Sequence, residues 1–76
     1  MNDDVTVLDT TGLYCPEPIM LLHAAMDDIT VGMQCMLIAS DPATKRDVPQ
    51  FCKFLGHSLL LEEEKDQKFR YLIQKC

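Results

Sequence analysis

Two prolines, Pro16 and Pro18, stand between a strand-like and a helix-like segment, and they constrain the fold more than any other feature. Proline is tolerated in the first turn of a helix, because the backbone N–H groups there have no intrahelical acceptor. The pattern therefore predicts that Pro16 is the first helical residue, Pro18 the third and Cys15 the N-cap. We expect a strand over residues 5–9 before this point, and a helix that continues to Ile29 after it.

Cys15 is the candidate functional residue, because a thiol at a helix start experiences the positive end of the helix dipole. That field favours the thiolate, which is the form of cysteine that attacks sulfur and carbon electrophiles. Glu17 acts in the opposite direction, since a nearby carboxylate disfavours a second anion. The sequence leaves open which effect is larger, and it also allows Cys15 to be only a weak cap or a small buried apolar residue.

The remaining elements follow from periodicity and turn residues. The expected elements are a buried strand over 35–40, a helix that begins near Asp47 or Val48 and ends at Gly56, and two further strands over 57–62 and 68–75, with residues 63–67 as the hairpin connection. The predicted fold is a single α/β domain, residues 1–76, in the order β-α-β-α-β-β. Two helices pack on one face of a four-stranded mixed sheet, which makes a two-layer sandwich.

The first two strands should be parallel, because a strand–helix–strand unit is normally a right-handed parallel crossover. Both helices then start at the same edge of the sheet. Cys15 and residues 41–47 would lie near each other there, with Lys45 or Arg46 within reach of the thiol. The alternative is that both cations are solvated surface charges.

The other reactive residue types are expected to be structural. Cys35 and Cys52 fall on apolar positions and are predicted to be buried, inert thiols, whereas Cys76 is expected to be mobile. His23 lies off the apolar stripe of its helix and is expected to be solvated. The spacing of Cys and His suits neither a metal site nor a Cys–His hydrolase, and we expect no cofactor.

Composition excludes several classes of function. The formal net charge of -5 argues against direct contact with nucleic acid phosphates and suits a protein partner with a basic surface. No apolar run approaches the ~18 residues of a membrane span. Residues 1–4 are acidic, unlike the start of a signal peptide, so we expect a cytoplasmic protein without disulfides.

Four segments carry a resemblance to a known family; they are residues 8–18, which contain Leu13-Tyr14-Cys15-Pro16-Glu17-Pro18, and residues 41–49, 51–54 and 69–73. Together they resemble the TusA/SirA family of small bacterial sulfur-carrier proteins over nearly the whole chain. Position 14 is a departure, because it is often arginine in the family and is Tyr14 here. The substitution removes a cation from beside the thiol.

The resemblance implies a sulfurtransferase that holds sulfur as a persulfide on Cys15, supported by Pro16, Glu17, Pro18 and Arg46. It implies a cysteine desulfurase as donor and a relay of sulfur-transfer proteins as acceptor. The sulfur would end in 2-thiouridine at the wobble position of tRNA, although related carriers serve sulfur oxidation or molybdenum-cofactor assembly. The alternative function is a redox-sensing or regulatory module in which Cys15 forms a sulfenic acid or mixed disulfide.

Overall fold

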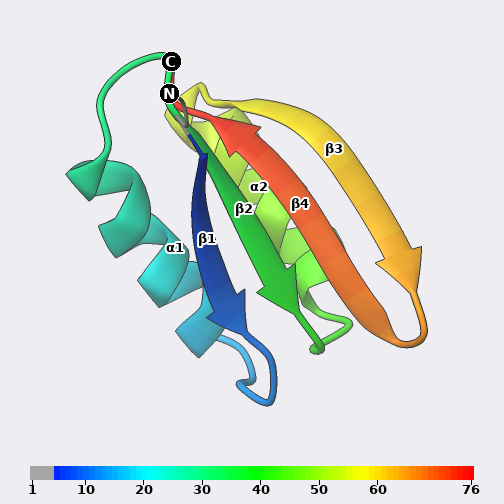
Figure 1. Ribbon diagram of the computed structural model, residues 1–76. Helices are drawn as coiled ribbons and strands as arrows, with labels where there is room; N and C mark the ends of the chain where they lie inside the picture. The colour runs from blue at the N-terminus through cyan, green and yellow to red at the C-terminus, as the bar shows by residue number, and fades with distance from the viewer. Residues whose placement is uncertain (1–4) are drawn as a thin grey trace.

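The computed structural model describes residues 5–76, so the acidic residues 1–4 lie outside the described part. The elements are β1 (Val5–Thr10), α1 (Glu17–Asp28), β2 (Gln34–Ala39), α2 (Thr44–Leu55), β3 (Ser58–Lys65) and β4 (Lys68–Gln74). The sheet has the order β1-β2-β4-β3, in which β1 and β2 are parallel and the other pairs antiparallel. Both helices lie on one face of the sheet (Figure 1). The predicted two-layer fold and its parallel crossover are therefore confirmed.

The core lies between the sheet and the helices. Successive strand side chains point to opposite faces, so alternate residues of β2 and β4 are buried beneath the helices. The core residues are Leu22, Met26, Ile29, Cys35, Leu37, Val48, Cys52, Phe69, Tyr71 and Ile73. The Tyr71 hydroxyl is satisfied within this layer by the Thr44 hydroxyl at 2.9 Å. In residues 5–76, neither helix has the length and apolarity that a membrane crossing requires.

The start of α1 lies one residue later than predicted. Pro16 occupies the N-cap position, Glu17 is the first helical residue and Pro18 the second. Cys15 therefore precedes the cap and is not the cap itself. The prolines still occupy the helix start, but Pro16 carries no side-chain donor or acceptor, and no side chain caps the helix. The helix ends at Asp28, one residue before the predicted end.

The start predicted for α2, near Asp47 or Val48, was wrong by about one turn. The helix begins at Thr44 and contains Pro49 as its sixth residue. A proline deprives only one carbonyl, four residues earlier, of its helical donor, and α2 tolerates this loss close to its N-terminus. No side chain caps this helix start, and the Thr44 hydroxyl donates to the Asp41 carbonyl at 2.7 Å. Gly56 ends the helix at φ 80°, as predicted.

The β3–β4 connection is tighter than predicted. Residues 63–65 belong to β3, and the turn consists of Asp66 and Gln67, both with positive φ. Two residues of positive φ are the geometry of the tightest hairpins. The acidic run is therefore paired with β4 and does not form a loop. The other strand ends differ from the prediction by at most one residue.

Candidate functional site

The candidate site lies at the carboxyl ends of the two parallel strands. Both β1 and β2 end there, and α1 and α2 both begin there (Figure 1). Cys15 belongs to the loop between β1 and α1, and residues 40–43 join β2 to α2. The predicted proximity of Cys15 to residues 41–47 is confirmed by direct hydrogen bonds.

Asp41 links the two loops. Its Oδ2 accepts a hydrogen bond from the Cys15 backbone N–H at 2.7 Å, and its Oδ1 accepts one from the Ala43 N–H at 3.1 Å. The Asp41 residue is buried, so little water competes for these bonds. A second link joins the Gly12 N–H to the Ser40 hydroxyl at 2.9 Å. The backbone that carries the thiol is therefore attached to the start of α2. The Cys15–Pro16 peptide bond is cis.

An apolar groove runs from Cys15 between α1 and α2. Residues that line it are Cys15, Pro16, Ile19, Met20, His23, Asp47, Gln50, Phe51, Lys53, Phe54 and Leu55. Phe54 is 88% exposed and Met20 63%, although both are large apolar side chains. Apolar surface of this kind next to a reactive residue is typical of a site that a partner covers. The groove gives the exposed thiol an open side from which a second molecule can approach.

The electrostatic surroundings of Cys15 raise the pKa of its thiol. The largest cause is a hydrogen bond from the thiol to the Asp47 carboxylate, followed by partial desolvation and the charges of Asp47 and Asp41. Arg46 lowers the pKa, but its effect is smaller. Two acidic residues of the second loop and helix, which the sequence comparison of the helix dipole with Glu17 did not include, therefore act on the thiol. Both carboxylates therefore favour the protonated form of the thiol.

The supporting residues predicted from the sequence have unequal positions. Pro18 is buried at the start of α1, whereas Glu17 is exposed and is not among the groups that shift the Cys15 pKa. Arg46 acts on the thiol through its charge, and its Nε donates to Asp47 Oδ1 at 3.1 Å. Lys45 instead forms an exposed ion pair with Glu64 at 3.0 Å. Of the two cations considered, only Arg46 influences the thiol.

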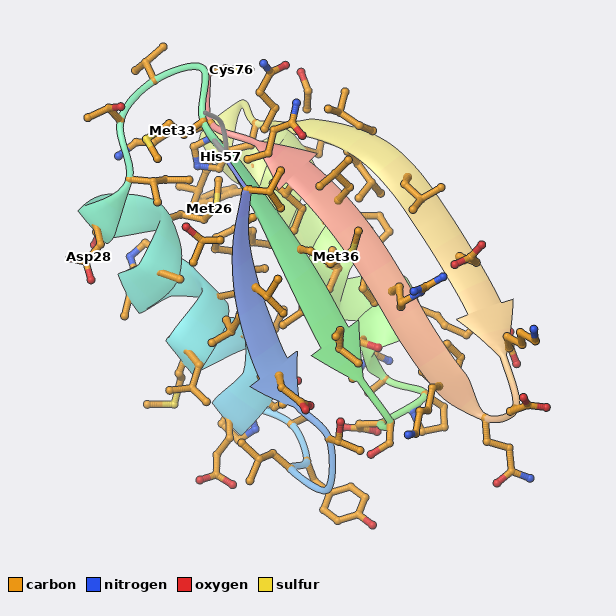
Figure 2. The ribbon with its side chains drawn as sticks, in the orientation of Figure 1. Met26, Asp28, Met33, Met36, His57 and Cys76 are labelled. Atoms are coloured by element: carbon orange, nitrogen blue, oxygen red, sulfur yellow. The ribbon has the colours of Figure 1, made fainter. Side chains whose placement is uncertain are left out.

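The other three thiols differ clearly from Cys15. Cys35 and Cys52 are buried, as predicted, and burial raises the pKa of Cys52 to about 11. Cys76 is exposed, and its Sγ lies 3.3 Å from the Ser58 hydroxyl. Its backbone N–H donates to His57 Nδ1 at 3.3 Å, and Figure 2 shows both residues at the same end of the sheet. His23 is exposed as predicted, and it contacts Phe51 edge-on.

Sequence reasoning missed the roles of Asp41 and Asp47. Asp41 resembles an ordinary turn residue before Pro42, and neither Asp41 nor Asp47 was among the residues expected to support Cys15. The available signal was the predicted parallel crossover, which brings every polar residue of 41–47 close to Cys15. In the described range 5–76, no group of three or more His, Cys, Asp or Glu could hold a metal ion.

Comparisons with known proteins agree with this arrangement. A family model described as Sulfurtransferase TusA matches residues 6–75. A sulfur carrier protein TusA from Pseudomonas putida is 51% identical over 69 residues, which cover 91% of this chain and 86% of that protein. One from Pseudomonas savastanoi is 48% identical, with coverage of 91% and 82%. A crystal structure of a SirA-like protein from Desulfitobacterium hafniense has a TM-score of 0.81 at 17% identity, and covers 92% of this chain and 95% of its own. This last likeness concerns the fold alone.

Proposed function

The chain belongs to the TusA family of sulfurtransferases and sulfur carriers, and we propose that Cys15 is the residue on which it carries sulfur, as a persulfide. The observation that supports this assignment most directly is the position of Cys15. Its thiol is exposed at the mouth of the apolar groove, while Cys35 and Cys52 are buried in the core. Thiol exchange requires direct access of one sulfur to another, and Cys15 offers that access beside a surface suited to docking.

The reaction is an exchange that neither oxidises nor reduces the pair of proteins as a whole. Cys15 sulfur attacks the outer sulfur of a donor persulfide, so that a new S–S bond forms and the donor's S–S bond breaks. The donor cysteine leaves as a thiolate, and the proton released from Cys15 neutralises it. A second exchange of the same kind delivers the outer sulfur to an acceptor cysteine.

For the partners, we propose a cysteine desulfurase as donor and a sulfur-relay protein complex as acceptor. The end product would be 2-thiouridine at the wobble position of tRNA. The net charge of -5 supports a carrier that meets basic protein surfaces and does not bind the tRNA itself. Four free cysteines suit a reducing compartment, so we place the reaction in the cytoplasm.

The raised pKa of Cys15 disfavours the alternative of a redox sensor. Peroxide reacts with thiolates, and sensor cysteines accordingly have depressed pKa values. Asp47 and Asp41 act in the opposite direction. Enzyme-catalysed exchange tolerates a protonated resting thiol, provided that the proton is removed during the attack.

The test is a loading assay with a cysteine desulfurase and cysteine, followed by mass spectrometry of the intact carrier and its peptides. We expect a gain of one sulfur atom on Cys15 and a loss of loading in Cys15→Ser. Cys76→Ser is the matched control, because it removes the other exposed thiol and should load normally. Loading of Cys15→Ser at the wild-type rate would refute the proposal. Wild-type protein that is modified by peroxide but gains no sulfur from the desulfurase would also refute it.

A further inference from the structure

Two carboxylates stand beside the Cys15 thiol, and they differ in how their oxygens are used. Both oxygens of Asp41 accept backbone hydrogen bonds, from Cys15 and from Ala43. Asp47 has its Oδ1 bound by Arg46 Nε at 3.1 Å, and its side chain is 18% exposed. Asp41 is therefore occupied as a structural acceptor, whereas Asp47 has an oxygen available for the thiol.

Asp47 is also placed where the reaction would occur. It lies in the first turn of α2 and lines the same apolar groove as Cys15. Its carboxylate is also the group that raises the pKa of the thiol most. Since the groove is the open side of the thiol, a docked donor would cover Asp47 together with Cys15.

We propose that Asp47 is a catalytic residue of the sulfur exchange, which accepts the Cys15 proton during attack and returns it to the leaving thiolate of the donor. This inference rests on the proposed persulfide chemistry of Cys15. It assigns to Asp47 a step that the overall exchange requires, because a thiol at neutral pH must lose its proton to become a nucleophile.

The step balances without any further reactant. As the Cys15 sulfur bonds to the outer sulfur of the donor, the S–H bond breaks and Asp47 takes the proton. The electron pair of the broken donor S–S bond stays on the donor cysteine. Asp47 then protonates that thiolate and regains its charge. Acceptance is coupled to S–S bond formation, because a carboxylate is too weak a base to hold the proton of a resting thiol.

Charge alone would give Asp47 an inhibitory effect on the free thiol. The charged groups around the thiol are Asp41, Asp47, Arg46 and Lys53 on the second loop and helix, with Glu17 in the first turn of α1. Removing the charge of Asp47 lowers the pKa of Cys15 and makes the free thiol more reactive. A role in proton transfer predicts the opposite effect on loading by the donor. The two readouts therefore separate simple repulsion from catalysis.

The experiment compares Asp47→Asn with wild-type protein in two assays at pH 7. The first is alkylation of Cys15 by iodoacetamide, which we expect to be up to about tenfold faster in the variant, as for a pKa shift of about one unit. The second is single-turnover persulfide loading from a cysteine desulfurase at saturating concentration. We expect loading to be at least about tenfold slower, since positioned acid–base groups contribute ~10²–10⁴-fold.

Two further variants complete the design. Asp28→Asn removes an equal charge from the far end of α1 (Figure 2) and should match wild-type protein in both assays. Asp47→Glu retains a carboxylate and should recover part of the loading rate. Circular dichroism and thermal unfolding establish that each variant is folded.

Faster alkylation combined with slower loading supports the proposal. If both rates rise, Asp47 only repels the thiolate, and the proposal is wrong. It is also overturned if loading is unchanged or if both rates fall together. If wild-type protein itself fails to load, the assignment of Cys15 falls first, and that of Asp47 with it.

Discussion

Cys15 and Cys76 are the two exposed thiols of the chain, and they lie at opposite ends of the sheet. Cys15 follows β1, where the parallel strands end, whereas Cys76 follows β4, which runs antiparallel to β2. The backbone of Cys15 is held by a buried carboxylate, and Cys15 lines an apolar groove together with Asp47. The sulfur of Cys76 contacts the Ser58 hydroxyl and the Gln74 carbonyl. Because both thiols are exposed, exposure alone does not distinguish them. The difference is the groove and the hydrogen-bonded loop that surround Cys15.

Rates of alkylation should separate the four cysteines most strongly. We expect native Cys35 and Cys52 to react at least about a hundredfold more slowly than Cys76, since they become accessible only through opening of the core. Cys15 should fall between these groups at neutral pH, because its raised pKa reduces the thiolate fraction. Peptide mass spectrometry after timed alkylation measures all four rates.

The same labelling in urea provides the control. Once the chain is unfolded, Asp47 and Asp41 no longer surround Cys15, and its rate should approach that of Cys76. Labelling of native Cys52 as fast as Cys15 would contradict the packing of α2 against the sheet. An unchanged ratio of Cys15 to Cys76 on unfolding would contradict the electrostatic account of the thiol.

Removal of a polar side chain should lower the free energy of unfolding more at the Cys15 end of the sheet than at the Cys76 end. Asp41→Ala leaves the N–H groups of Cys15 and Ala43 without their acceptor, so we expect a loss of about 1–3 kcal/mol in the free energy of unfolding. Ser58→Ala, beside Cys76, should stay within about 0.5 kcal/mol. Urea unfolding monitored by circular dichroism gives both values, and equal losses would show that Asp41 is not a structural link.

The smallest expected effect concerns Arg46, which is 70% exposed in its side chain and lowers the Cys15 pKa only weakly. Arg46→Glu removes an attractive charge and adds a repulsive one, so the pKa of Cys15 should rise by less than about one unit. The alkylation curve would move to higher pH, so the rate falls at any fixed pH below the midpoint. The shift should shrink at high salt, and a curve that does not move at low salt would exclude an influence of Arg46.

The sequence was sufficient for the layers, because alternating strands and apolar helix stripes specify them. Gly56 and the prolines at 16 and 18 also gave helix limits close to the observed ones. The start of α2 was missed because Pro49 favours a helix boundary, and one missing hydrogen bond near a helix start can be absorbed by tertiary packing. The periodicity of apolar residues does not show whether packing outweighs the hydrogen bond lost at Pro49.

The electrostatics of the site were harder to predict than its location. A parallel crossover placed residues 41–47 near Cys15, and the structure confirms it. Successive residues of a helix project in directions ~100° apart, so Arg46 and Asp47 cannot both face the thiol in the same way. The phase of α2 therefore decides whether a cation or a carboxylate has the larger effect on the Cys15 thiol. This phase was not predictable, because the predicted start of α2 was wrong by one turn.

The pair of hydrogen bonds from Gly12 and Cys15 to Ser40 and Asp41 has a consequence for insertions and deletions. The two donors are three residues apart, and their acceptors are adjacent, so the number of residues between the donors is fixed by the geometry of the second loop. An extra residue at position 13 or 14 would displace one donor and uncouple the thiol from α2. The turn at Asp66 and Gln67 joins β3 to β4, on the side of the sheet away from β1. Its length is not fixed by hydrogen bonds to the site, so we expect it to accept additional residues.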